Sequence, residues 1–245
     1  MGMPEGASRP RYFLLDELRG LAIISMVVYH AFYSLAFVFG SGAGLTLFGF
    51  AEPVQPFIAG TFFFLCGLCC RFSRSNLKRG LRLAGAAALV TLATLAMTLF
   101  GVDEVIWFGV LHFLACAVLL FVPLRKLLDR APPLPQLVAF TALFLGWRLA
   151  PPLPRTGFFP LYMLGFPSHT LHSADYFPLL PWLFLFLAGS AAGVYGARGQ
   201  FPGWLGKSRV PALQWLGRHS LLIYLLHQPV LYAVFMALRM AGVGL

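Results

Sequence analysis

The chain is poor in charge, and above all in acidic residues. Only 8 of its 245 residues are Asp or Glu, against 18 Lys and Arg, and charged residues of all kinds make up 11% of the sequence. Soluble domains carry about 25% charged residues, so this composition excludes an ordinary soluble fold. Hydrophobic residues account for 59% of the chain and the mean hydropathy is +0.80, which predicts an integral membrane protein.

Several familiar motifs are also missing. No Walker or GxGxxG loop is present, so the sequence gives no sign of a nucleoside triphosphate or dinucleotide site. Only four cysteines occur, Cys66, Cys69 and Cys70 in "FLCGLCC" and Cys116 in a later apolar run. Because a CxxC spacing inside a lipid-embedded helix is weak evidence for a metal site, we expect reduced, buried cysteines that behave as small hydrophobic residues.

Seven apolar runs approach the length of about 20 residues that a helix needs to cross the hydrocarbon core. They cover residues 14–39, 54–71, 81–100, 105–124, 134–150, 177–196 and 219–240. Barrel strands are excluded because the runs are too long and do not alternate. The fifth run is the weakest of the seven, since Pro133, Pro135 and Pro151 crowd it.

The predicted fold is therefore an all-α integral membrane protein with about seven transmembrane helices around a central polar cavity. Residues 1–12 are expected to form a cytoplasmic N-terminal tail, and residues 13–245 a single transmembrane domain. With the N-terminus in the cytoplasm and the C-terminus outside, 15 of the 18 basic residues fall on the cytoplasmic side. This topology, with attraction to anionic headgroups, explains the net charge of +10 without a nucleic-acid partner.

Three histidines, His30, His112 and His227, interrupt the apolar runs. At 1.5 Å of rise per residue, each lies about 13 to 20 Å above the nearest arginine on the cytoplasmic side, which predicts one broad layer near the middle of the membrane. Ionisable groups are costly at that depth, so each is a functional candidate. The alternative is that they bond to one another or to hydroxyl groups and fix the packing of the helices.

Helical spacing places further polar residues on the faces that carry these histidines. Arg19 and His30 are eleven residues apart, almost a whole number of turns, and share one face of the first run with Ser34. Ser220, Tyr224, His227 and Gln228 form a polar stripe along the last run. Both faces are expected to meet protein or water rather than lipid.

The stretch "RFSRSNLKRGLRL", residues 71–83, joins the second and third runs. Its Arg71, Arg74, Lys78 and Arg82 recur at helical spacing. The positive-inside rule and contact with lipid phosphates would explain them. Alternatively, guanidinium groups match the phosphates of a cytoplasmic coenzyme, and coenzyme A suits this stretch better than a nucleotide triphosphate.

A polar loop, "PSHTLHSADYFPLLPW", precedes the sixth run. His169, His172 and Asp175 could ligate a metal if the loop were helical, but nearby proline and serine argue against a regular helix. Asp175 is expected instead to cap or orient the start of the sixth run. Together with Tyr176, it is a candidate for acceptor recognition on the outer face.

Five blocks of sequence follow one another between about Arg11 and Val230. They are "RYFLLDELRGLAIISMVVYHAFYSL", "GTFFFLCGLCCRFSRSNLKRGLRL", "WFGVLHFLA", "DYFPLLPWLFLFLAGSAAG" and "LGRHSLLIYLLHQPV". Together they resemble a short bacterial member of the heparan-alpha-glucosaminide N-acetyltransferase catalytic-domain family. The "RGLA" block at residues 19–22, followed by His30, is similar also to wider transmembrane acyltransferases that use a membrane-embedded histidine.

The resemblance implies a multi-pass acyltransferase of the bacterial cytoplasmic (inner) membrane. It would take acetyl from cytoplasmic acetyl-CoA, without a metal, and pass it to a sugar amine or hydroxyl, free or on a glycolipid, outside. A homodimer is also implied. On this reading His30 is the base or transient acyl carrier, and His112 and His227 are its partners or oxyanion donors.

The remaining site residues are assigned around this centre. The expected orienting residues are Tyr224, Ser220, Asp175 and Tyr176. The arginines expected to bind the coenzyme are Arg19, Arg71, Arg74, Arg79, Arg82 and Arg218. Two other classes stay open, a small-solute or lipid transporter that uses the same buried polar layer and a non-catalytic assembly subunit with structural histidines.

Overall fold

The computed structural model describes residues 11–101, 104–151, 153–173 and 175–244. Throughout these residues the chain is helical or irregular, and its β-structure is limited to two isolated bridges, Phe108 with Tyr176 and Thr156 with Ser168. The all-α prediction is confirmed. The expected tail at residues 1–12 lies outside the described residues except for its last two.

Six helical segments are long and apolar enough to cross a membrane, which confirms a multi-pass membrane protein. They are Phe13–Val38, Gly42–Cys70, Asn76–Phe100, Val110–Leu128, Leu179–Ala197 and Ser220–Met240. The fifth predicted run corresponds to helix α6, Pro133–Leu149, of 17 residues. It is shorter than each of the six segments, so six of the seven predicted spans are confirmed among the described residues.

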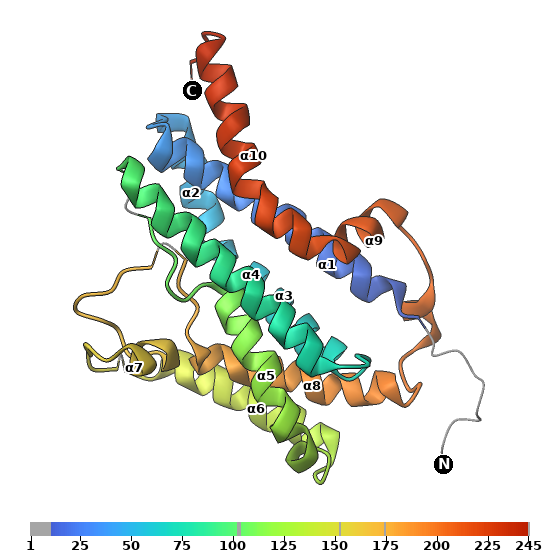
Figure 1. Ribbon diagram of the computed structural model, residues 1–245. Helices are drawn as coiled ribbons and strands as arrows, with labels where there is room; N and C mark the ends of the chain where they lie inside the picture. The colour runs from blue at the N-terminus through green and yellow to red at the C-terminus, as the bar shows by residue number, and fades with distance from the viewer. Residues whose placement is uncertain (1–10, 102–103, 152, 174, 245) are drawn as a thin grey trace. The chain divides into compact units, whose positions relative to one another are not determined.

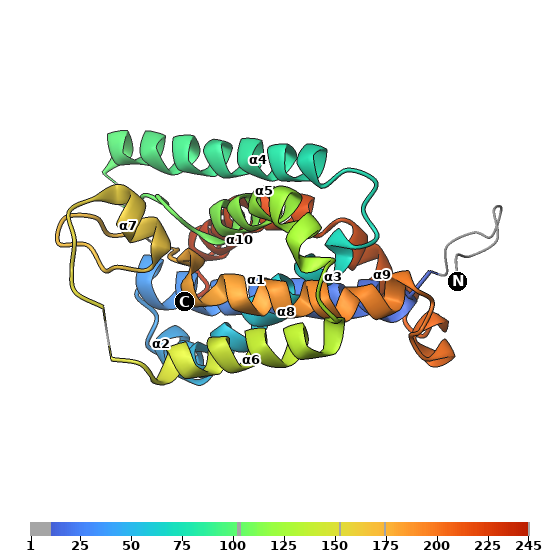
Figure 2. The same cartoon turned by 90° about the horizontal axis from the view of Figure 1, so that it is seen from below.

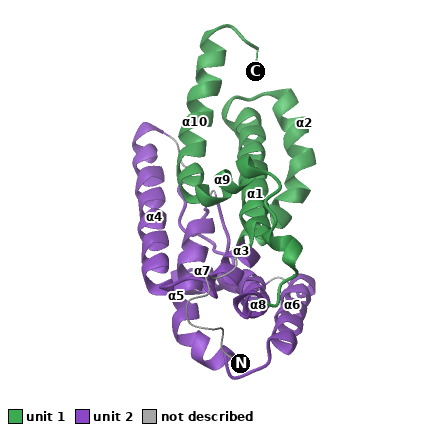
Figure 3. Ribbon diagram, turned by 90° about the vertical axis from the view of Figure 1, so that its right-hand side faces the viewer, with its two compact units in different colours: residues 1–62, 199–245 green, residues 63–198 purple. Residues whose placement is uncertain are grey.

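The chain divides into two compact units, and each is described by itself (Figure 3). Unit 1 contains the chain up to Phe62 and from Gly199 onward, and unit 2 contains residues 63–198. The helices of unit 1 are α1 (Phe13–Tyr33) with a π-helical continuation (Ser34–Val38), α2 (Gly42–Ala51), the start of α3 (Gln55–Cys70), α9 (Pro211–Arg218) and α10 (Ser220–Met240).

In unit 1 the short helix α9 lies against α1 (Figure 1). Two glycines permit the close approach, because a Cβ atom on Gly20 would lie 2.0 Å from the carbonyl oxygen of Leu213, and one on Gly217 would lie 2.0 Å from that of Asp16. Small residues at helix contacts are typical of membrane proteins. These two glycines therefore set the contact between α1 and α9.

A buried carboxylate of α1 completes the start of α9. Oε1 of Glu17 accepts hydrogen bonds from the backbone N–H groups of Arg209 and Val210, at 2.8 and 3.0 Å, and from the side-chain amide of Gln214 at 2.8 Å. A negative charge at a helix N-terminus satisfies N–H groups that have no partner within the helix. Glu17 thus joins the two ends of the chain.

Unit 2 contains the rest of α3 and five further helices. They are α4 (Asn76–Met97), α5 (Val110–Leu128), α6 (Pro133–Leu149), α7 (Phe159–Leu164) and α8 (Leu179–Ala197). Helix α4 packs along α5, and α6 runs alongside α8 (Figure 2). Phe63, Phe113, Phe121 and Phe186 are fully buried and form the core of this unit.

Glycines also bring α3 and α8 together within unit 2. A Cβ atom on Gly67 would lie 1.9 Å from the carbonyl oxygen of Phe186, and one on Gly189 would lie 2.0 Å from that of Phe64. Gly193 follows Gly189 by one turn, and a Cβ atom on it would lie 2.5 Å from the carbonyl oxygen of Leu68. This small-xxx-small pattern lets the two backbones touch.

Candidate active site

Two of the predicted histidines meet in unit 1. His30, near the end of α1, and His227, in the middle of α10, have ring centroids 4.8 Å apart and ring planes inclined by 56°. His227 is 8% exposed. The faces predicted from helical spacing therefore bring these two residues together, 197 positions apart in the sequence.

A hydrogen-bonded chain defines the state of His30. The side-chain amide nitrogen of Gln228 donates to Nδ1 of His30 at 3.0 Å, and the hydroxyl of Ser34 donates to Oε1 of Gln228 at 3.3 Å. An amide nitrogen only donates, so Nδ1 of His30 is an acceptor. In the neutral ring the proton therefore lies on Nε2, which is available as a donor.

His227 has the opposite arrangement. Its Nδ1 contacts the backbone carbonyl of Tyr224, which only accepts, so Nδ1 carries the proton and Nε2 carries a lone pair. Nε2 is buried and has no hydrogen-bond partner among the described residues. Buried polar atoms are nearly always paired, and an exception marks a functional candidate.

Tyr224, one of the two predicted orienting residues of α10, lies beside this pair. Tyr224 supplies the carbonyl that fixes His227, and its ring centroid is 5.5 Å from that of His227. Ser220 begins α10 one turn earlier. Gln228 and Ser34 lie on the predicted polar faces but had no predicted role, because spacing along one helix does not show which side chains of another helix it meets.

His112 lies in unit 2, and all of its hydrogen-bonding capacity is used. The backbone N–H of Gly109 donates to Nδ1 at 3.3 Å, so Nε2 carries the proton and donates to the hydroxyl of Thr91 at 2.9 Å. Thr91 in turn donates to the carbonyl of Ile106 at 2.7 Å. His112 therefore closes the first turn of α5 as a capping side chain, which supports the structural interpretation for this residue.

Arg71, predicted to bind the coenzyme, is buried. Its Nε donates to the carbonyl and hydroxyl oxygens of Ser190 at 3.2 and 3.0 Å, its Nη1 pairs with Asp129, and its guanidinium lies 5.1 Å from the ring centroid of Phe121. The side chain is 4% exposed. Arg71 thus joins the ends of α3 and α5 to the middle of α8, a role that its place in a basic run did not reveal.

Arg79 is half-buried, and its guanidinium group lies against the sulfur atoms of two cysteines. Its Nη2 lies 3.1 Å from Sγ of Cys66, and its Nη1 lies 3.6 Å from Sγ of Cys70. Both cysteines are buried and free of disulfides, in line with the predicted reduced state. Arg74, Lys78 and Arg82 are exposed, so they are the members of the basic stretch that a coenzyme could reach.

The other two predicted arginines belong to unit 1. Arg19 forms an ion pair with Asp16 at 3.2 Å, one turn earlier on α1. Arg218, at the end of α9, is exposed and its Nε donates to the carbonyl of Gln214 at 3.1 Å. Arg19 is partly buried and Arg218 is open to solvent.

Asp175 caps a different helix from the one expected. Its Oδ2 accepts a hydrogen bond at 3.0 Å from the backbone N–H of Val110, the first residue of α5, whereas the sequence predicted the start of the sixth run, α8. The expectation was wrong because it assumed that a capping residue lies next to its helix in the sequence, whereas a carboxylate can also cap a helix that is distant along the chain. The carboxylate here serves a helix that begins 65 residues earlier.

Tyr176 is fixed beside Tyr162. Its hydroxyl donates to the carbonyl of Tyr162 at 2.7 Å, and the two rings stack with centroids 4.4 Å apart. Burial, followed by the neighbouring Tyr162, raises the pKa of the Tyr176 phenol, so it stays protonated and donates. His169 and His172 are exposed. Among the described residues no three His, Cys, Asp or Glu side chains are grouped to hold a metal ion.

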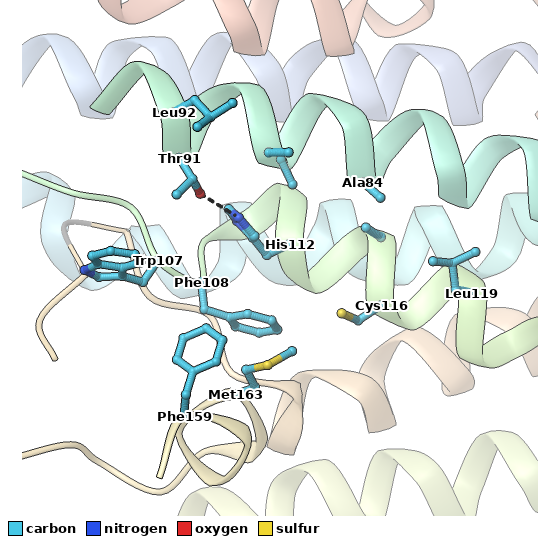
Figure 4. Close-up of a pocket in the computed structure, with 13 residues that line it drawn as sticks. Ala84, Thr91, Leu92, Trp107, Phe108, His112, Cys116, Leu119, Phe159 and Met163 are labelled. Carbon is cyan, nitrogen blue, oxygen red and sulfur yellow. Dashed lines mark hydrogen bonds between the residues drawn. The ribbon is translucent and has the colours of Figure 1, made fainter. Parts of the chain in front are cut away.

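Unit 2 also contains a cavity of about 490 Å³ between α4 and α5 (Figure 4). His112 and Thr91 form part of its wall, and rings from Trp107, Phe108 and Phe159 line one end. Most of the lining is apolar. This cavity could not be predicted from the sequence, since the small residues that leave it open are also common at helix contacts.

Comparison with known proteins gives one family. The sequence profile of the family described as "Heparan-alpha-glucosaminide N-acetyltransferase, catalytic" matches residues 11–229. Neither curated proteins nor solved structures give a match. The matched range confirms the resemblance carried by the five sequence blocks.

Proposed function

The chain belongs to the heparan-alpha-glucosaminide N-acetyltransferase catalytic family, and from this premise we propose that it transfers an acetyl group from acetyl-CoA to a sugar amine or hydroxyl across the membrane. The family and the six apolar helices make it a membrane acyltransferase. The donor would be taken from the cytoplasm and the acceptor from the outer side. A bacterial cytoplasmic membrane and a homodimeric state are part of the same proposal.

The observation that carries the proposal is the unpaired Nε2 of His227. Acyl transfer needs a base to take the proton of the attacking amine or hydroxyl. A buried imidazole whose Nδ1–H is held by a backbone carbonyl presents its lone pair at Nε2 in a fixed direction. His227 is therefore the proposed base.

His30 is the proposed complementary donor. Because Gln228 occupies its Nδ1, its Nε2–H is free to donate to the oxygen that becomes negative when the acceptor attacks the thioester carbonyl. The acceptor forms the new bond to the acetyl carbon, the proton goes to His227, and the carbon–sulfur bond breaks to release the coenzyme thiolate. Protonation of this thiolate restores the neutral histidines.

The supporting residues divide into two groups. Gln228 and Ser34 are positioning residues for His30, and Tyr224 with Ser220 is proposed to position His227. His112 is proposed to position the start of α5 rather than to react. Arg74 and Arg82 of unit 2, and Arg19 and Arg218 of unit 1, are each proposed as contacts for coenzyme phosphates, while Arg71 and Arg79 hold the helices that carry the basic stretch.

Acetyl-CoA binding and turnover by the purified protein test the proposal. Calorimetry measures binding, and release of free coenzyme A is followed with and without glucosamine. We expect wild type to bind and turn over, and His227→Ala and His30→Ala to bind but stall. His219→Ala is a matched control, because His219 is an exposed histidine that immediately precedes α10. Absence of coenzyme binding by a folded wild type would contradict the acyltransferase assignment and favour the transporter or assembly class.

A further inference from the structure

Residues 203–215 of unit 1, called here the α9 surface, have no role in the proposed acetyl transfer. They comprise a 3₁₀ turn (Gly203–Gly206) and most of α9. Helix α9 packs against α1 as far along as Gly20, which lies about 10 Å from the start of α1 at Phe13 (Figure 1). Because α1 is long and apolar enough to span the membrane, the α9 surface lies near the depth at which lipid head groups meet hydrocarbon.

The backbone beneath the α9 surface is fixed to α1. Glu17 accepts hydrogen bonds from the backbone N–H groups of Arg209 and Val210. Before the 3₁₀ turn, the ring of Phe201 meets that of Tyr12 edge-on, with ring centroids 5.1 Å apart. Because the chain is held both before the turn and at the start of α9, the α9 surface is a fixed part of unit 1 rather than a loose loop.

The α9 surface exposes large apolar side chains. Trp204 is 49% exposed, Val210 44% and Trp215 54%. On α9 itself, Gln214 and Gly217 are buried against α1, so the ring of Trp215 lies on the face turned away from α1. Tryptophan is enriched where a membrane meets water, because its ring is apolar and its N–H is polar. The two exposed indole rings are therefore suited to the head-group region of a bilayer.

The α9 surface is also positively charged. Lys207 and Arg209 are exposed, and residues 199–245 contain no Asp or Glu. The two acidic residues at the start of α1 are already engaged, Asp16 by arginine ion pairs and Glu17 by the start of α9. Neither cation forms an ion pair with another described residue. An anion from outside the chain is therefore their natural partner.

One contact joins the two kinds of side chain. The guanidinium carbon of Arg209 lies 5.6 Å from the centroid of the Trp204 ring, a cation–π arrangement. The charged group is thus held beside an exposed aromatic ring. A phospholipid supplies a phosphate to the cation and hydrocarbon to the ring, whereas inorganic phosphate serves the cation alone.

We propose that the α9 surface binds an anionic phospholipid, with Lys207 and Arg209 on its phosphate and with Trp204 and Trp215 against its glycerol and upper hydrocarbon. The surface lies on the side of the membrane predicted to be cytoplasmic, where anionic lipids give the bilayer a negative surface potential. The proposal adds a lipid site to the chain and does not depend on acetyl transfer.

The first test counts the lipids bound to the purified protein in a neutral detergent by native mass spectrometry. We expect wild type to bind phosphatidylglycerol about tenfold more tightly than phosphatidylcholine, because each basic residue near an anionic lipid adds about fivefold. Lys207→Gln/Arg209→Gln should lose most of this preference. Lys126→Gln/Arg130→Gln, which removes one Lys and one Arg from exposed positions around the end of α5, should keep it.

The matched double variants separate a defined site from the general attraction of a basic protein for anionic lipid. Equal losses in both double variants, or no preference in wild type, would overturn the proposal. Displacement of phosphatidylglycerol by coenzyme A would also overturn it, because the α9 surface would then bind the coenzyme. None of these measurements requires turnover, so failure of the acetyltransferase assignment would leave the lipid site intact.

A second measurement uses the tryptophans as reporters and leaves the charges in place. Nanodiscs contain equal fractions of brominated phosphatidylglycerol or brominated phosphatidylcholine, whose bromine atoms quench nearby tryptophan fluorescence. We expect stronger quenching by the phosphatidylglycerol, a difference that Trp204→Phe/Trp215→Phe removes and that Trp147→Phe, in α6, keeps. Salt at about 1 M should reduce the difference, because exposed charges are screened. Equal quenching of wild type by the two lipids would contradict the proposal.

Discussion

The histidine pair of unit 1 and the single histidine of unit 2 differ in how their nitrogens are used. His112 has both ring nitrogens bonded, one to Gly109 and one to Thr91. In the pair, Gln228 and Tyr224 each engage one nitrogen, and Nε2 of His227 is buried without a partner. Both places hold a histidine on an apolar helix, so hydrogen bonding is the difference on which we base a catalytic role for the pair and a structural role for His112.

The largest effect is expected at His227. His227→Ala removes the proposed base, and turnover should fall by about 10² to 10⁴, the range that general-base catalysis contributes. Calorimetry should show acetyl-CoA binding close to that of wild type. Turnover at the wild-type rate by folded His227→Ala protein would contradict the proposed difference between the histidine pair and His112, because the unpaired nitrogen would then have no chemical role.

His112→Ala should act on stability instead. It leaves the N–H of Gly109 without its acceptor at the start of α5, a loss of about 1 to 2 kcal/mol, as for other helix caps. Thermal unfolding in detergent measures this loss. Turnover per folded molecule should stay near that of wild type, and a collapse of turnover without a change in stability would place His112 with the reactive pair.

Gln228→Met tests the role proposed for His30. The substitution keeps the length of the side chain but removes the N–H that fixes Nδ1 of His30. Since the ring then samples both tautomers, kcat should fall by about tenfold, near the value of one lost hydrogen bond to a positioned group. Steady-state kinetics should show an unchanged KM for acetyl-CoA, and a change confined to KM would contradict a positioning role.

The smallest effect is expected at Ser34. Ser34→Ala removes the 3.3 Å hydrogen bond to Gln228, which orients the amide but does not touch either histidine. Turnover should fall less than in Gln228→Met, by a factor that corresponds to about 0.5 to 1 kcal/mol. A larger fall than in Gln228→Met would show that Ser34 acts on the reaction by another route.

Much of the fold followed from the sequence, because the bilayer imposes length and apolarity on each span. The periodicity of α1 and α10 correctly identified the faces that carry His30 and His227. The same reasoning could not assign partners between distant segments. Asp129, which pairs with Arg71, and Asp175, which caps α5, are both far along the chain from the groups they serve.

The basic stretch, residues 71–83, also shows that helical spacing could not predict which individual residues are buried. Arg71, Arg74 and Arg82 were equivalent members of one helical stripe, yet Arg71 is buried against Ser190 while Arg74 and Arg82 are exposed. Spacing describes one helix, and burial depends on which neighbours it meets. The one available signal in the sequence was the position of Arg71 directly after the apolar helix α3. An arginine at such a position can turn back into the protein.

The most direct test of the central claim is a side-by-side measurement of single-turnover coenzyme A release by His227→Ala and His112→Ala, normalised to folded protein. The account predicts a loss of about 10² or more for His227→Ala and a rate near wild type for His112→Ala. Equal losses, or a greater loss for His112→Ala, would contradict the assignment of the unpaired nitrogen of His227 as the base.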